Sequence, residues 1–167
     1  PTRNEYLAAW ADSTGMGSVK ALRLRHDGQP IGGEIAVFSQ QAMPGMGSTH
    51  IAYQPSQDRF LVVWSEMEGG RGRFVSGSGL VGSNVVSVSS IGGASAVIGH
   101  HLPGSDSFLV VYQAASANPC CTQRIYIQRL TATGALNGPP VTVDGEPSGA
   151  LYLGDVALDS AGDKALV

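Results

Sequence analysis

A short apolar segment that recurs along the chain is the feature that most constrains its fold. Phe60-Leu61-Val62-Val63-Trp64 returns 48 residues later as Phe108-Leu109-Val110-Val111-Tyr112. Tyr6-Leu7-Ala8-Ala9-Trp10 has the same pattern 54 residues before Phe60, and Ala165-Leu166-Val167 is a decayed fourth copy. Odd and even positions of each copy are both apolar. Each copy is therefore predicted to be a strand buried between two neighbouring sheets.

The segments around these copies also recur. A short apolar strand and a turn rich in Ser, Asp, Gly or Pro precede the buried strand, in residues 51–59, 98–107 and 156–164. Two more strands follow it, predicted at 19–25, 73–76 and 125–131, and then at 34–38, 85–89 and 141–143. Between them lie Asp27-Gly28, Ser78-Gly79 and Thr133-Gly134, where glycine supplies the positive φ of a tight hairpin.

Four antiparallel strands in a repeat of about fifty residues are typical of β-propeller blades. We therefore predict an all-β fold of about three four-stranded blades, forming one propeller segment over residues 1–167. The predicted blades are residues 1–42, which lack the inner strand, 43–90, 91–146 and a partial blade at 147–167. A β-sandwich with coincidental internal similarity is the alternative.

Composition agrees with short strands joined by tight turns. The 167 residues include 23 glycines, and only 14% of the residues are charged. The net charge of −3 gives no electrostatic reason to expect nucleic acid as a partner. No apolar stretch approaches the roughly 20 residues that span a bilayer, so no membrane insertion is expected.

The two cysteines, Cys120 and Cys121, are adjacent. This spacing does not match the paired Cys-x-x-Cys pattern of a zinc site. A vicinal disulfide ranks first, because exposed neighbouring thiols tend to oxidise outside the cytosol, although such a bridge distorts the intervening peptide. Bridges to another chain and two free thiols are the alternatives.

The repeat resembles that of bacterial secreted β-propeller proteins. The residues that carry the resemblance are Ile51-Ala52-Tyr53, Asp58, Phe60 to Trp64, Ile125-Tyr126-Ile127-Gln128-Arg129-Leu130, Gly134 and Val141-Thr142-Val143. The resemblance implies an exported module, secreted or at the cell surface, and carries no catalytic set. Arg71-Gly72-Arg73-Phe74-Val75 departs from the Ile-Tyr-x-Gln-Arg-Leu pattern, so this strand is expected to be shorter or more irregular.

Closure is the physical problem for about three blades, because propellers usually close with four to eight. Further blades of a longer chain could complete the ring. Alternatively, a second copy could, if the spare inner strand near residues 151–158 of one copy completes the first blade of the other. The surplus residues 163–167 mildly favour the first alternative.

Polar residues on the predicted inner strands are the candidate binding site, because ligands often bind along the central channel. They are His50, Tyr53, His100, His101 and Asp155. Convergence of His50, His100 and Asp155 would suit a metal or a sugar. Ordinary hydrogen-bonded or solvated residues are the favoured interpretation, so no metal and no cofactor are predicted.

Other candidates also have structural interpretations. Asp12, Glu66 and Glu68 follow the buried strand and could suggest glycosidase chemistry, but the third copy has Gln113-Ala114 there. Trp10, Trp64 and Tyr112 are equivalent and are expected in the core. The favoured function is therefore a non-catalytic exported propeller module with a structural or protein-interaction role. A carbohydrate-binding propeller is the second hypothesis, and a fragment of a propeller hydrolase is the third.

Overall fold

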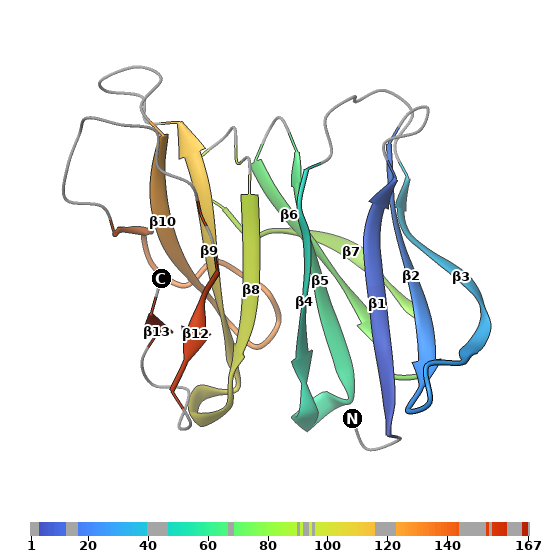
Figure 1. Ribbon diagram of the computed structural model, residues 1–167. Helices are drawn as coiled ribbons and strands as arrows, with labels where there is room; N and C mark the ends of the chain where they lie inside the picture. Colours follow the sequence, from blue (N-terminus) through green and yellow to red (C-terminus); the bar gives the residue numbers. More distant parts are fainter. Residues whose placement is uncertain are drawn as a thin grey trace.

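The structure is a computed structural model, which describes residues 4–12, 17–39, 47–66, 69–89, 91, 94, 96–115, 123–143, 153, 155–159 and 165–166. These residues form β-strands, with two single-turn 3-10 helices (Figure 1). The predicted all-β class with antiparallel pairing is confirmed. The sheets do not close on themselves within this part of the chain. No helix among the described residues is long and apolar enough to cross a membrane.

Sheet 1 contains three strands, β1 (Glu5–Asp12), β2 (Ser18–Arg25) and β3 (Pro30–Ser39), in the order β1-β2-β3. β1 and β2 pair in continuous register from Glu5 opposite Arg25 to Asp12 opposite Ser18. The turn into β3 contains Gly28 with φ of 82°. Within the described residues no strand pairs with the other edge of β1. Sheet 1 therefore ends on an open strand edge.

Sheets 2 and 3 each contain four strands in sequential order. Sheet 2 comprises β4 (Thr49–Gln54), β5 (Arg59–Glu66), β6 (Gly69–Ser76) and β7 (Val81–Ser87). Sheet 3 comprises β8 (Ala96–Leu102), β9 (Ser107–Ala115), β10 (Gln123–Leu130) and β11 (Val141–Thr142). A two-stranded hairpin, β12 (Ala157–Leu158) and β13 (Ala165–Leu166), follows.

The sheets stand side by side, with sheet 1 at the right of Figure 1, sheet 2 in the middle and sheet 3 at the left, where β12–β13 overlap the lower part of sheet 3 in this view. β1, β4, β8 and β12 lie along the same side of this row (Figure 1). Each sheet packs face to face against the next. Buried side chains form three clusters, between sheets 1 and 2, between sheets 2 and 3, and between sheet 3 and the segment around β12.

Successive side chains of β5 point to opposite faces of sheet 2, and a neighbouring sheet covers each face. This explains why its apolar run has no polar face. Val62 and Trp64 pack toward sheet 1, whereas Leu61 and Val63 pack toward sheet 3, and all four have no exposed surface. β9 repeats this arrangement, since Val110 packs toward sheet 2 and Val111 toward β12. The prediction that both runs are buried between neighbouring sheets is confirmed. Apolar side chains on both faces are what a strand in a stack of sheets requires.

The prediction that β6 is shorter or more irregular is wrong for its length and correct for its irregularity. β6 has eight residues, as many as β10, and pairs with β5 without interruption from Gly69 to Ser76. An irregularity occurs only toward β7, between Arg73 and Val75. Gly70 and Gly72 belong in this strand because a Cβ at Gly70 would lie 2.9 Å from Val88 Cγ2, and one at Gly72 would lie 3.0 Å from Val88 Cγ1. Glycine allows this close approach.

The glycines predicted at the hairpins have positive φ, 82° at Gly28, 91° at Gly79 and 84° at Gly134. Two other turns use aspartate instead. The 3-10 helix η1 (Pro55–Gln57) is followed by Asp58 with φ of 44°, and η2 (Pro103–Ser105) by Asp106 with φ of 47°. Aspartate tolerates this left-handed conformation better than most residues. The two turns therefore have the same backbone form.

Candidate functional site

His50 and His100 come together at the seam between sheets 2 and 3. β4 carries His50 and β8 carries His100, and these two strands lie beside each other (Figure 1). The ring centroids are 5.6 Å apart with an angle of 52° between the planes. The two histidines are not equivalent in the repeat. His50 pairs with Val63, and the equivalent pair in sheet 3 is Ile98 with Val111. The meeting of the two histidines is a consequence of sheet packing.

His50 is held by the backbone of sheet 3. Its Nδ1 lies 3.0 Å from the Gly99 carbonyl oxygen and 3.3 Å from the Gly99 amide nitrogen. The neutral ring accepts the amide hydrogen through Nδ1, or donates to the carbonyl oxygen when that nitrogen is protonated. Gly99 fits here because a Cβ would already lie 3.3 Å from Val63 Cγ2. His50 is therefore part of the contact between sheets.

His100 is partly buried near His50 and Asp155. Its Nε2 is buried and has no hydrogen-bond partner within the part of the chain that the structure describes. Burial, together with the neighbouring His50, lowers the pKa of His100 below its ordinary value of 6.5, whereas Asp155 opposes this shift. Asp155 itself accepts a hydrogen bond from the Val156 amide at 2.7 Å. The cluster therefore favours a neutral His100.

Tyr53 and His101 are equivalent positions that serve the two aspartate turns. The Tyr53 hydroxyl donates to Asp58 Oδ1 at 2.9 Å, and His101 Nε2 lies 2.9 Å from Asp106 Oδ1. The contact with His101, with further hydrogen bonds from Ser56 and Gln54, lowers the pKa of Asp106 below 3.8. Both side chains lie beside the turn of their own hairpin. The structure thus brings His50 and His100 together and places Tyr53 and His101 at the turns.

A polar network that the sequence analysis missed links these turns across sheets 2 and 3. Arg59 Nε donates to Gln54 Oε1 at 2.7 Å, and its Nη2 donates to the Ala132 carbonyl at 2.7 Å. The guanidinium also lies 3.9 Å from the centroid of the Phe74 ring. Ser56 Oγ lies 2.8 Å from both carboxylate oxygens of Asp106 and donates to one of them. Only a weak indication of this network was present in the sequence, namely the polar Gln54 at the end of a mostly apolar strand.

The acidic candidates have cationic or indole partners. Asp12 Oδ2 lies 3.0 Å from Lys20 Nζ, and Glu34 Oε2 lies 3.5 Å from the same nitrogen. Glu66 is buried and accepts the Trp64 Nε1 hydrogen at 2.6 Å. No three His, Cys, Asp or Glu side chains among the described residues are grouped so that they could hold a metal ion. Glu68, Cys120 and Cys121 lie outside the described residues.

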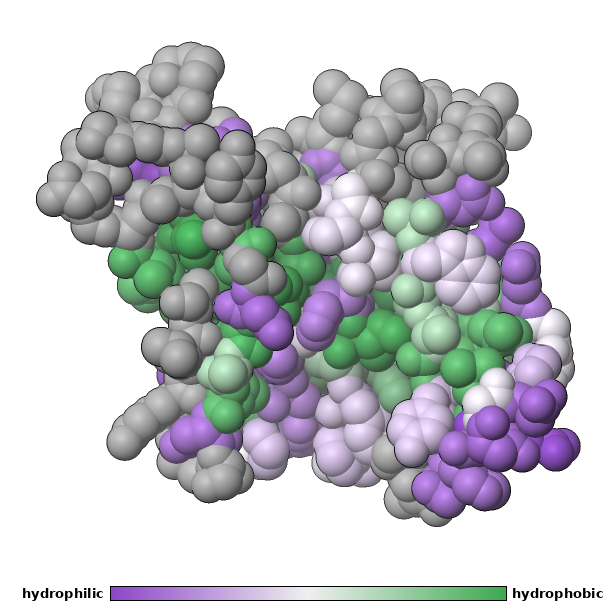
Figure 2. All heavy atoms as spheres, in the orientation of Figure 1, coloured by the Kyte–Doolittle hydropathy of each residue, from purple (hydrophilic) through white to green (hydrophobic). Residues whose placement is uncertain are grey.

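Two apolar sheet faces lie at the two ends of the row of sheets. The β1–β2 end face is the side of sheet 1 that points away from sheet 2. Its apolar residues are Tyr6, Ala8, Trp10, Leu22 and Leu24, and the ion pair of Lys20 with Asp12 lies at one end of it. The β10–β11 end face is the side of sheet 3 that points away from sheet 2, and consists of Ile125, Ile127, Val141 and Val143. Figure 2 shows hydrophobic residues at the surface over β1–β2 and over β9–β10.

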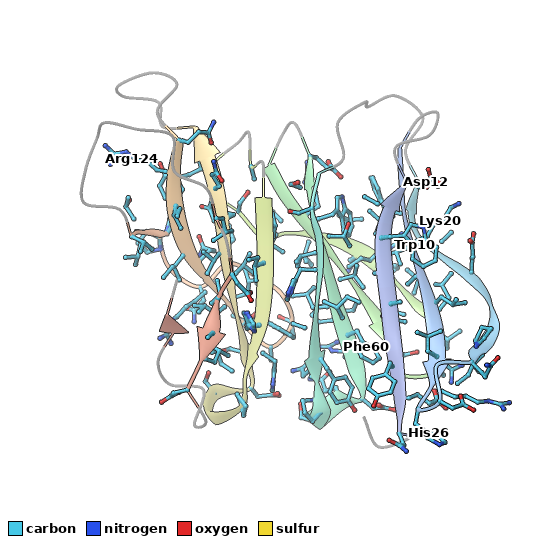
Figure 3. All side chains as sticks on the ribbon, viewed as in Figure 1. Trp10, Asp12, Lys20, His26, Phe60 and Arg124 are labelled. Atoms are coloured by element: carbon cyan, nitrogen blue, oxygen red, sulfur yellow. The ribbon has the colours of Figure 1, made fainter. Side chains whose placement is uncertain are left out.

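Trp10 differs from its two equivalents. Trp64 and Tyr112 have no exposed surface, whereas Trp10 is only partly buried and Tyr6 beside it is 56% exposed. Figure 3 places Trp10 near Asp12 and Lys20 at one end of β1 and β2. The expectation that all three aromatics lie in the core is therefore wrong for Trp10. The reason is that no sheet of the described chain covers its face.

No protein-family model matches the chain, and no curated protein is similar to it in sequence.

Proposed function

We propose that this chain is a non-catalytic, exported β-propeller module with a structural or protein-interaction role. The observation that carries the proposal is the pair of apolar end faces on a row of stacked sheets. A monomer rarely leaves large apolar sheet faces in water, because burying apolar surface contributes about 25 cal/mol per Å². Such faces are typical of surfaces that another sheet covers.

The propeller arrangement has support in the order of the strands. Sheets 2 and 3 run from an inner strand, β4 or β8, outward through three sequential antiparallel neighbours. β12 follows on the next layer, and β4 and β8 lie next to each other. A ring of blades has this connectivity, with inner strands around an axis. Closing such a ring requires partners for both end faces.

The role of the polar candidates favours interaction over catalysis. His50 contacts the backbone of a neighbouring sheet, and Tyr53 and His101 contact turn aspartates. Asp12 and Glu66 are each engaged by a residue of their own sheet. A general acid–base pair needs side chains aimed at a substrate position. The side chains named above instead contact other residues of the protein.

Export is supported by the resemblance of the repeat and by the adjacent cysteines. An oxidising compartment allows Cys120 and Cys121 to bridge. Intact mass after alkylation without reduction tests this part, because a bridged pair takes up no alkyl group. Alkylation of both thiols in the exported protein would contradict it.

The interaction role is tested with the dye ANS, which fluoresces on exposed apolar surface. The dilute wild-type chain is expected to bind ANS, and Trp10→Lys is expected to bind clearly less. The matched control is Leu80→Lys, because Leu80 is 74% exposed in the turn between β6 and β7, away from both end faces. Equal binding by Trp10→Lys and wild type would contradict the proposal, as would glycan binding or hydrolysis of glycoside substrates.

A further inference from the structure

The β1–β2 end face has the chemistry of a surface that is covered elsewhere in the same chain. The equivalent face of sheet 2 presents Trp64, which packs against sheet 1, and that of sheet 3 presents Tyr112, which packs against sheet 2. Trp64 and Tyr112 are fully buried in these junctions. Trp10 occupies the same position on sheet 1. Its face is therefore one half of a junction, and within the described residues no other sheet packs against it.

The opposite end of the row carries the other half. In both internal junctions, the face opposite the aromatic residue is mainly aliphatic. Ala9, Val19 and Ala21 share a buried cluster with Trp64, whose ring also lies 5.0 Å from the ring of Phe38. Leu61, Val63 and Val88 share a buried cluster with Tyr112. The β10–β11 end face is aliphatic as well. Val141 is 62% exposed and Val143 43% exposed, because the segment around β12 covers only part of sheet 3. One chain thus presents both complementary faces, pointing in opposite directions.

We infer that the β1–β2 end face binds the β10–β11 end face of a second copy of this chain. This inference rests on the proposed interaction role and names its partner. In a twofold pair, each copy contributes both of its end faces, so that two equal junctions form and no end face stays exposed. A head-to-tail contact of this kind closes when the rotation between copies returns to the start.

The strand count fits the same arrangement. Sheet 1 has three strands where sheets 2 and 3 have four, and its open edge is β1. β12 lies over sheet 3 in the position of the missing inner strand, packed through Val156 and Leu158. In the pair, β1 of the second copy takes the edge of β12 that β13 occupies. β13 holds this edge through only two residue pairs, Ala157 with Leu166 and Leu158 with Ala165.

The first experiment measures mass in solution. Light scattering during gel filtration, across the micromolar range, is expected to give twice the chain mass of 17.2 kDa at the upper concentrations. Acrylamide quenching of Trp10 is expected to fall over the same range, because the contact buries its indole. Trp64 is already fully buried and contributes little to the change. A monomer throughout the range, with Trp10 quenchable throughout, overturns the inference.

Variants of each face then test the head-to-tail geometry. Trp10→Lys and Val141→Lys are each expected to be monomeric, while the Leu80→Lys control keeps the wild-type mass. An equimolar mixture of the two variants is expected to recover a weaker dimer, because one junction of the pair then combines two intact faces. Circular dichroism and the emission of Trp64 check that each variant is folded.

The outcomes separate this inference from the proposed function. If Val141→Lys still dimerises while Trp10→Lys does not, the β1–β2 faces pair with each other and the inference is overturned. A dimer that survives Trp10→Lys overturns it as well. ANS binding that depends on Trp10, without a dimer in any sample, would leave the interaction role standing and remove the second copy as its partner.

Discussion

The Tyr53 hydroxyl donates a hydrogen bond to Oδ1 of Asp58, 2.9 Å away, across the turn that joins β4 to β5. The next sheet repeats the relationship with His101 and Asp106. In both turns the aspartate has positive φ and follows a proline-initiated 3-10 helix. The side chain five residues earlier thus stabilises a backbone conformation that most residues avoid. A pair of residues that the sequence suggested for ligand binding serves the geometry of the hairpin.

Replacing Tyr53 tests this role. Tyr53→Phe keeps the ring, which packs 4.8 Å from the Phe60 ring, and removes only the hydroxyl. The free energy of unfolding is expected to fall by about 1 kcal/mol, the usual contribution of one hydrogen bond. Urea unfolding followed by circular dichroism measures the change. A stability equal to that of the wild type would show that the hydroxyl is not needed at the turn.

Gly70 tests the close packing of β6. A methyl group there would lie 2.9 Å from Val88 Cγ2 and 3.3 Å from Val97 Cγ2, so Gly70→Ala is expected to destabilise the protein by about 1–3 kcal/mol. Gly33→Ala in β3 is the matched control, because its Cβ has nothing within 4 Å. The control is expected to stay within about 0.5 kcal/mol of the wild type. Equal thermal midpoints for both variants would refute the packing argument.

Arg59 tests the network between sheets 2 and 3. Arg59→Lys retains the positive charge but cannot reach Gln54 and Ala132 at once, and it loses the planar contact with Phe74. The expected cost is about 1–2 kcal/mol in the free energy of unfolding. A double-mutant cycle with Gln54→Ala should give a non-additive result. Additive effects would mean that the two residues act independently.

His100 should make stability depend on pH. Its pKa is lower in the folded protein than its ordinary value of 6.5, so the unfolded chain binds the proton more readily. The resulting stabilisation is complete above pH 6.5 and is lost as the pH falls from there toward the folded pKa. Thermal midpoints should therefore decrease over this window. His100→Gln should weaken the decrease, and an unchanged slope in that variant would assign the effect to other groups.

The sequence predicted the strands well where local pattern and packing agree. The runs at Phe60 and Phe108 are apolar on both faces, and only a strand between two sheets buries both. Gly28, Gly79 and Gly134 marked the hairpins because their positive φ is a local requirement. Only the length of β6 was underestimated, and for the opposite reason. Its glycines have low strand propensity, and their place depends on Val88, which approaches from outside the strand.

What the sequence alone determined is the antiparallel all-β class, the burial of β5 and β9, and the turns, since hydrophobic periodicity and backbone sterics act within a few residues. Tertiary structure decided which side chains meet. His50 and His100 lie in different sheets and are not equivalent in the repeat, and Arg59 reaches Ala132 in the next sheet. Tertiary structure also decided how far Trp10 is buried, because its burial depends on whether another sheet covers it. A strand's own residues specify its faces, and only neighbouring sheets determine what those faces touch.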